Sequence, residues 1–217
     1  MPKPETKILR LQKALDLISA KDYESAELEI KSAIEEAEQK KDILSEGLLY
    51  STLGLLFKLQ KDFKTAWKHY EKAEKLLPDD PAIKLISARL LVEIFGQYDS
   101  ALKKADKVLK IAPHEGVFAH QAHITKGLVY LKKGDKKKAQ EELQLSMAHD
   151  FENLGSVGNI DFKLIEALLK KQTALEDCFA YLKKALAFAQ KTEEKKYIQL
   201  IQRLIEGFPK EKNNSIL

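Results

Sequence analysis

The most constraining feature of the sequence is an ordered series of small and aromatic residues. It runs Tyr50-x2-Leu53-Gly54-x2-Phe57, followed by Phe63, Ala66-x3-Tyr70, Ala73 and Pro78. Gly54 and Ala66 allow two antiparallel helices to approach closely, and Pro78 ends the second helix. The aromatic residues fill the space around this close contact. The series therefore predicts a tightly packed helix pair.

Weaker copies of this series recur along the chain. When the chain is aligned on Ala66, small residues stand at positions 26, 66, 101, 139 and 178, spaced 40, 35, 38 and 39 residues apart. A period near this length is typical of stacked helix pairs, none of which can bury its apolar face alone. Strands are not expected, because Ala, Leu, Lys and Glu dominate and the chain has only nine Gly and six Pro.

The complete series around Gly54 resembles the tetratricopeptide repeat. The resemblance covers residues 7–192 and implies an all-α, right-handed superhelical solenoid of stacked antiparallel helix pairs. Five repeats are expected, at about 7–40, 47–80, 82–115, 120–153 and 159–192. The best repeat is defined structurally by Tyr50, Leu53, Gly54, Phe57, Ala66, Tyr70, Ala73 and Pro78.

Apolar periodicity and capping signals predict about eleven helices. They are expected at 7–20, 24–39, 43–60, 63–77, 81–95, 99–111, 115–133, 136–149, 160–171, 174–190 and 193–207. The last has no partner in sequence, so residues 193–208 are expected to cap the fifth repeat. Residues 1–6 and 209–217 are expected to be disordered.

Two repeats depart from the pattern. Arg89 and Glu166 stand in the third and fifth copies where Gly54 stands in the best one, so these pairs are expected to splay. The longer separations predict extra loop residues around Lys40–Leu44 and at 153–159, which are the expected hinges.

Composition narrows the functional class. With 44% hydrophobic and 32% charged residues, and no apolar run of transmembrane length, the chain is expected to be cytoplasmic. A single cysteine, Cys178, excludes a disulfide scaffold and is expected to fill a small packing position. The net charge of +4 comes from Lys, with Arg only at 10, 89 and 203, which makes nucleic acid an unfavoured partner.

The sequence contains no recognisable catalytic motif. A phosphate-binding glycine loop, a nucleophile elbow and a Cys–His arrangement are all absent. His120 and His123, with His114 nearby, have the spacing of metal ligands on one helix face, but ordinary surface histidines are the favoured interpretation. We therefore expect a protein that is not an enzyme and has no cofactor or metal.

A Lys-rich turn between Lys132 and Lys138 is the densest basic cluster. It could contact an acidic partner, a phosphate or an anionic membrane, and salt-dependent binding would reveal such a role. A solvated turn between two helices is the favoured interpretation.

The resemblance implies that the first helix of each pair lines a concave face. The corresponding positions are Leu11, Leu15, Leu48, Ser51, Leu55, Lys58, Leu59, Ile83, Ile86, Leu90, Glu93, Ile94, Gln121, Ile124, Leu128, Leu131 and Lys132. Most are aliphatic, and an exposed aliphatic groove of this length normally marks an interface. Family members that hold the acidic tails of heat-shock chaperones use Lys, Asn and Arg on these helices. The corresponding positions of this chain do not contain these Lys, Asn and Arg residues.

The sequence thus favours a non-catalytic scaffold or adaptor that binds an apolar helix or extended peptide of another protein in its concave groove. A chaperone-like role for a component of a secretion, envelope or motility assembly is the alternative within this class. Self-association, or coverage of the groove by the chain's own terminal helix, could bury the same residues.

Overall fold

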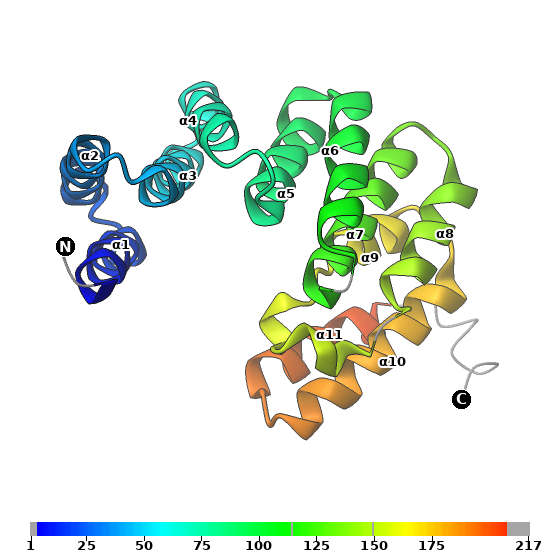
Figure 1. Cartoon of the computed structure of the whole chain (residues 1–217). Helices are drawn as coiled ribbons and strands as arrows, with labels where there is room; N and C mark the ends of the chain where they lie inside the picture. The colour runs from blue at the N-terminus through cyan, green and yellow to red at the C-terminus, as the bar shows by residue number, and fades with distance from the viewer. Residues whose placement is uncertain (1–3, 114, 149, 208–217) are drawn as a thin grey trace. The chain divides into compact units, whose positions relative to one another are not determined.

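The structure, a computed structural model, describes residues 4–113, 115–148 and 150–207, with side chains from Leu9 onward. Within these ranges the chain is all-helical, as predicted (Figure 1). It divides into two compact units, Met1–Ile94 and Phe95–Leu217. The boundary falls inside the third predicted repeat, which is the repeat with Arg89 at the glycine position.

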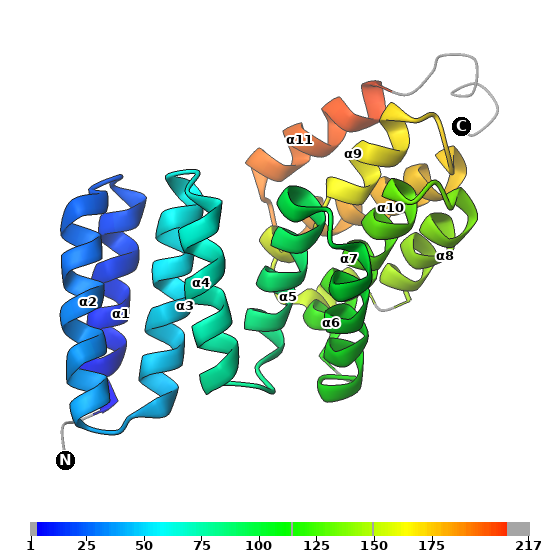
Figure 2. The ribbon, with the colours of Figure 1, turned by 90° about the horizontal axis from the view of Figure 1, so that it is seen from above.

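The first unit consists of α1 (Pro4–Ser19), α2 (Tyr23–Gln39), α3 (Ile43–Leu59), α4 (Phe63–Leu76) and α5 (Pro81–Leu90). Consecutive helices pack against one another, and α1 also reaches α3. Figure 2 shows α1 to α4 running alongside one another as two antiparallel pairs. A π-helical turn, η1 (Leu91–Phe95), follows α5.

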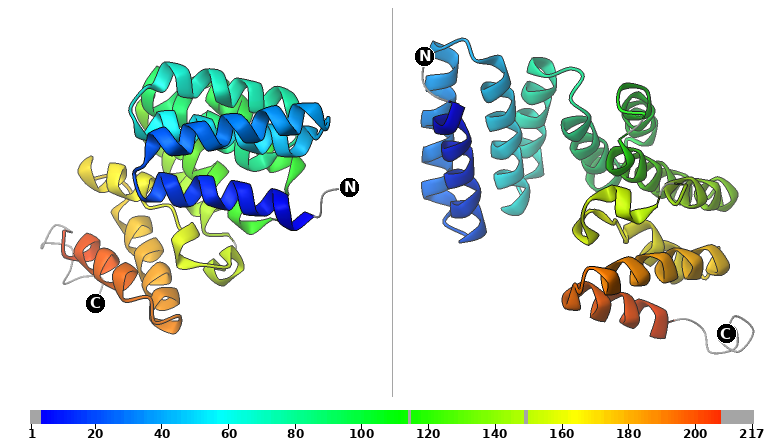
Figure 3. Two further views of the ribbon diagram at one scale, coloured as in Figure 1. Left: turned by 90° about the vertical axis from the view of Figure 1, so that its left-hand side faces the viewer. Right: turned by 60° about the horizontal axis from the view of Figure 1, so that its bottom comes forward.

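The second unit contains α6 (Tyr98–Ile111), α7 (Gly116–Lys132), α8 (Lys136–Ser146), α9 (Lys163–Lys170), α10 (Leu175–Lys191) and α11 (Lys195–Glu206). Two short 3₁₀ helices, η2 (Phe151–Leu154) and η3 (Val157–Asn159), lie between α8 and α9. α7 packs on α6, α8 and α9, and α11 packs on α10 (Figure 3).

Close helix contacts form at the predicted small residues. Ala26, Ala66, Ala101, Ala139 and Cys178 are all completely buried. A Cβ atom added to Gly54 would lie 2.7 Å from Cε1 of Tyr70, whose ring is buried in the α3–α4 contact. Leu53 and Ala73 are buried beside it. These residues are therefore buried where neighbouring helices approach closely.

The remaining residues of the best repeat lie at its edges. Tyr50 and Phe57 are half-buried, and both rings stack on His69, with centroids 6.0 Å and 5.3 Å away. α4 ends at Leu76, and Leu77 leaves the helical region because it precedes Pro78. Pro78 itself is exposed.

Four of the turns between helices contain a left-handed residue followed by an Asp at the N-cap of the next helix. Lys21, Lys41, Lys61 and Gly134 all have positive φ, and each precedes an Asp. The side chains of these Asp residues accept a hydrogen bond from the backbone N–H three residues later, as at Asp62 and Thr65. The cap satisfies an otherwise unpaired N–H and fixes where the next helix begins.

Helix bounds agree with the sequence predictions to within three residues, with one exception at 81–95. There the α-helix ends at Leu90 and continues as the π-helical turn. The structure also places Pro4 at the start of α1, inside the stretch expected to be disordered, and proline suits the first helical position. The tail expected at 209–217 lies outside the described residues.

The predicted hinge at 153–159 is a packed segment of the second unit. Phe151, Leu154, Val157 and Ile160 are buried, and the side-chain amide of Asn159 donates to the Leu154 carbonyl at 2.7 Å. An extended loop with four buried apolar side chains belongs to the core, because these contacts would be lost if it opened.

Candidate protein-binding surface

Helix α3 presents an aliphatic stripe on the face opposite its buried one. Leu49, Leu53 and Leu56 point into the core of the first unit. On the other face, Leu44 and Leu59 are 60% and 46% exposed. Between them lie the partly exposed Leu48, Ser51 and Leu55, and the spacing of three or four residues places all five on one side of the helix. We call these five residues the α3 stripe.

The neighbouring helix α1 adds less exposed aliphatic surface to the α3 stripe than the sequence suggested. Leu11 packs against the core of the first unit and Leu15 is only partly exposed. Lys58, beside the α3 stripe, is half-buried. The exposed aliphatic surface of these two helices is therefore centred on α3.

The other predicted groove residues fall into two groups. Ile83, Leu90, Ile124, Leu128 and Leu131 are buried, so they are not exposed groove residues. Ile86 and Gln121 are partly exposed, while Glu93, Ile94 and Lys132 are exposed. The predicted groove residues thus do not form one exposed aliphatic surface along the chain.

Burial along α7 follows from its three packing partners. The helix contacts α6, α8 and α9, and a Cβ atom added to Gly127 would lie 2.4 Å from Cδ2 of Leu164 on α9. The sequence could have indicated this burial, because α7 has small or apolar residues on every side. A helix that is apolar all round is buried rather than half-exposed.

His120 is buried, which corrects its interpretation as a surface histidine. Its Nδ1 lies 2.9 Å from the Ser146 carbonyl, and its Nε2 accepts a hydrogen bond from the Asp161 N–H at 3.2 Å. Tyr181 donates to the Asp161 carbonyl at 2.8 Å, with its hydroxyl 3.2 Å from the same Nε2. Because a carbonyl only accepts and an N–H only donates, the imidazole is neutral with its proton on Nδ1.

The His120 cluster joins four separate segments of the second unit. The imidazole belongs to α7, Ser146 ends α8, Asp161 precedes α9 and Tyr181 lies on α10. Phe151 packs edge-on against both His120 and Tyr181. Burial lowers the pKa of His120, opposed by the hydrogen bond to Ser146 and the charge of Asp161. The cluster therefore connects these four segments through contacts to one titratable side chain, that of His120.

His123 lies in a second polar group and does not join His120. Its Nδ1 is 2.7 Å from Oε2 of Glu142, whose other oxygen is 3.0 Å from Nζ of Lys126. Lys126 also pairs with Asp106 at 3.0 Å. Burial alone would lower the pKa of Lys126, but the hydrogen bonds to Glu142 and Asp106 raise it above its usual value.

The described residues contain no group of three or more His, Cys, Asp or Glu placed to hold a metal ion, and His114 lies outside them. Burial raises the pKa of the Cys178 thiol to about 12, which leaves it protonated and unreactive. None of the described helices is long and apolar enough to span a bilayer.

The Lys-rich turn is an exposed connection between α7 and α8. Lys133 pairs with Asp99 at 2.9 Å, and Lys138 lies 3.5 Å from Asp135, the N-cap of α8. Lys132, Lys136 and Lys137 are exposed. Three lysines in the first turn of α8 oppose the helix dipole, so the cluster is not placed there for helix stability.

The fold matches solved structures over nearly the whole chain. PilW, described as a widely conserved type IV pilus biogenesis factor, matches with a TM-score of 0.64 and 16% identity, covering 99% of this chain and 100% of PilW. Pseudomonas aeruginosa PilF matches with a TM-score of 0.62 and 14% identity, covering 91% of this chain and 89% of PilF. A tetratricopeptide protein of Thermus thermophilus matches with a TM-score of 0.65 and 17% identity, covering 93% and 98%.

These similarities establish the fold. The chain has the tetratricopeptide-repeat fold, which agrees with the packing around Gly54 and with the five buried small residues. No family model and no curated protein matches the sequence. Because the identities are low, the functions of these similar proteins do not transfer with the fold.

Proposed function

We propose that the protein is a non-catalytic scaffold that binds an apolar helix or extended peptide of another protein on the α3 stripe. The observation that supports this is the exposure of Leu44 and Leu59 at the two ends of the α3 stripe. A helix that buries aliphatic residues on one side and presents them on the other leaves apolar area in water. Covering that area with a partner is favourable by roughly 25 cal/mol per Å².

The α3 stripe suits an amphipathic partner helix. Its members repeat every three or four residues, which matches the spacing of apolar residues on one face of a second helix. Ser51 in the middle is small and allows close approach, while Lys58 lies at the edge and favours an acidic residue on the partner. Orientation would thus come from charge and affinity from the leucines.

The double variant Leu44→Glu/Leu59→Glu tests this proposal. Both side chains are exposed, so the variant is expected to keep the thermal stability of the wild type while losing its partner. Leu145→Glu is the matched control, because Leu145 is 48% exposed on α8 and lies outside the α3 stripe. The measurement is affinity capture from the native cell with mass-spectrometric identification. A partner retained by Leu44→Glu/Leu59→Glu at wild-type yield would refute binding on this face.

A role in a pilus-type or other envelope assembly is the more specific form of this proposal. Its support is the similarity in fold to PilW, whose description names pilus biogenesis. Under this form, the partner captured by the wild type is a component of such an assembly. A partner from an unrelated process would leave the scaffold proposal intact and remove the assembly role.

A further inference from the structure

Two exposed leucines lie on second helices of the pairs, away from the α3 stripe. Leu28 on α2 is 66% exposed and Leu145 on α8 is 48% exposed. A single exposed leucine is ordinary on a protein surface. What distinguishes Leu28 is the pattern of charges around it.

Leu28 is at the centre of a fully exposed face of α2. With 3.6 residues per turn, one line of the helix contains Glu24, Leu28, Lys31, Ser32, Glu35 and Gln39, all of them exposed. The opposite face is buried against α1 and α3. We call this line the α2 face.

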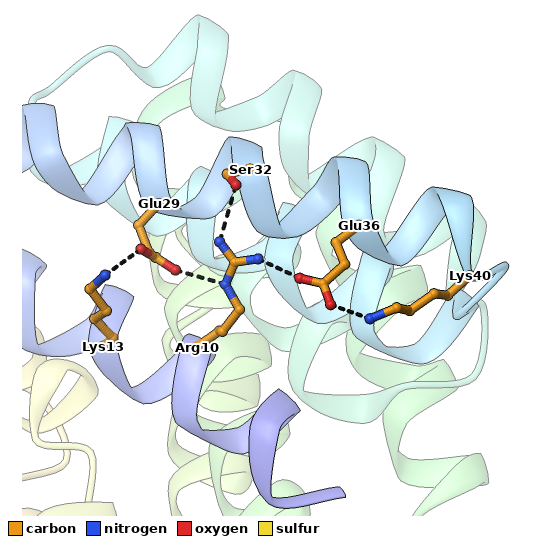
Figure 4. Close-up of polar contacts among 6 residues, drawn as sticks. All are labelled: Arg10, Lys13, Glu29, Ser32, Glu36 and Lys40. Carbon is orange, nitrogen blue, oxygen red and sulfur yellow. Dashed lines mark hydrogen bonds and ion pairs between the residues drawn. The ribbon is translucent and has the colours of Figure 1, made fainter. Parts of the chain in front are cut away.

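Other carboxylates of α2 are already engaged beside this face. Glu29 accepts from Nε of Arg10 at 2.8 Å and pairs with Lys13 at 2.6 Å, and Glu36 contacts Arg10 and Lys40 (Figure 4). Arg10 also donates to Ser32 at 3.1 Å. In contrast, Glu24 and Glu35 form no ion pair within the described part of the chain.

The charges of the α2 face are antisymmetric about Leu28. Glu24 lies about 6 Å before Leu28 along the helix axis and Lys31 about 4.5 Å after it, on the same side of the line. Turning the helix end over end about Leu28 therefore exchanges the position of Glu24 with that of Lys31.

We propose that the α2 face is a self-association surface on which a second copy of this chain packs its own α2, antiparallel and related by a twofold axis through Leu28. In this arrangement Leu28 contacts its twofold mate, and Glu24 faces Lys31 of the other copy. The twofold axis produces this pair twice, giving two ion pairs around an apolar centre. A parallel arrangement would place like charges together.

The proposed contact between the two α2 helices is small, so we expect a weak dimer. One helix crossing another buries well under the roughly 800 Å² per partner of a stable interface. Lys31 must also divide its charge between Glu24 of the second copy and its own Glu27, 2.6 Å away. The dimer should therefore form at high protein concentration and low salt, and weaken as salt screens the pairs.

Analytical ultracentrifugation of the full chain is the first test. At low ionic strength the wild-type mass is expected to rise with concentration from 24.7 kDa toward twice that value, and to return to the monomer in about 0.5 M salt. Leu28→Ser should weaken dimerisation at least about tenfold. Leu145→Ser, the matched control, should dimerise as the wild type does, as should Leu44→Glu/Leu59→Glu, since the α2 face is independent of the α3 stripe.

Exchanging the charges tests the antiparallel register. Glu24→Lys alone places two lysines opposite each other and Lys31→Glu alone places two glutamates opposite each other, so each should weaken the dimer. The double variant Glu24→Lys/Lys31→Glu should restore it. A wild type that stays monomeric at every concentration, a Leu145→Ser effect equal to that of Leu28→Ser, or failure of the double variant to restore association would overturn the proposal.

Discussion

Tyr70→Ala is expected to destabilise the first unit by about 3–5 kcal/mol, the usual cost of removing a large buried aromatic ring. Tyr70 is completely buried and its ring packs on Gly54, so this substitution leaves a cavity in the α3–α4 contact. Tyr70→Phe should behave quite differently. The Tyr70 hydroxyl is buried and has no hydrogen-bond partner among the residues that the structure describes, so removing it should leave stability unchanged or raise it by about 1 kcal/mol.

Tyr181 provides the matched control for this prediction. It is equally buried, but its hydroxyl is 2.8 Å from the Asp161 carbonyl and 3.2 Å from His120. Tyr181→Phe should therefore cost about 1–2 kcal/mol, because the Asp161 carbonyl loses its donor. Urea unfolding followed by circular dichroism measures all three variants. A Tyr70→Phe variant as unstable as Tyr181→Phe would show that a buried water satisfies the Tyr70 hydroxyl.

The helices could be predicted because their signals are local. Helices α2, α3, α4, α5 and α8 each follow an Asp whose side chain caps the helix within three residues. The small residues at positions 26, 66, 101, 139 and 178 recur at nearly constant spacing. The α3 stripe is likewise a pattern within one helix. These features need only neighbouring residues, so a sequence shows them directly.

The burial of the predicted groove residues on α7 depends on partners far along the chain. Leu128 and Leu131 have the spacing expected of residues that line a groove. However, α9 packs against α7, the helix that contains both residues, and both are buried. His120 is an extreme example, because Tyr181 is 61 residues away in sequence. Spacing along one helix cannot reveal which face a distant segment will cover.

Acid should weaken the second unit through His120. Burial lowers the pKa of this imidazole from its usual value of 6.5, so the unfolded chain binds a proton more readily than the folded one. Stability from the neutral imidazole is complete above about pH 6.5 and is lost progressively as the pH falls toward the lowered pKa. Protonation would also place an Nε2–H against the Asp161 N–H, two donors that cannot bond.

The amide of Asp161 offers a local measurement of this effect. Because its N–H donates to His120, its hydrogen-exchange protection factor should fall between about pH 7 and pH 5, after correction for intrinsic exchange. In His120→Gln, protection at neutral pH should be lower and should depend little on pH in this window. His69 also has a pKa lowered by burial, but it lies on α4 of the first unit. His69→Gln should therefore leave the Asp161 response intact.

Carboxylates with lowered pKa values cannot produce the same signal. Glu29 and Asp62 have pKa values lowered by their hydrogen bonds, so the stability they contribute is lost only below about pH 4.5. The interval between about pH 5 and pH 7 thus isolates the histidines. If Asp161 protection stays constant across this interval in the wild type, protonation of His120 does not open this hydrogen bond between about pH 5 and pH 7, and the predicted loss of stability through His120 in this interval is wrong.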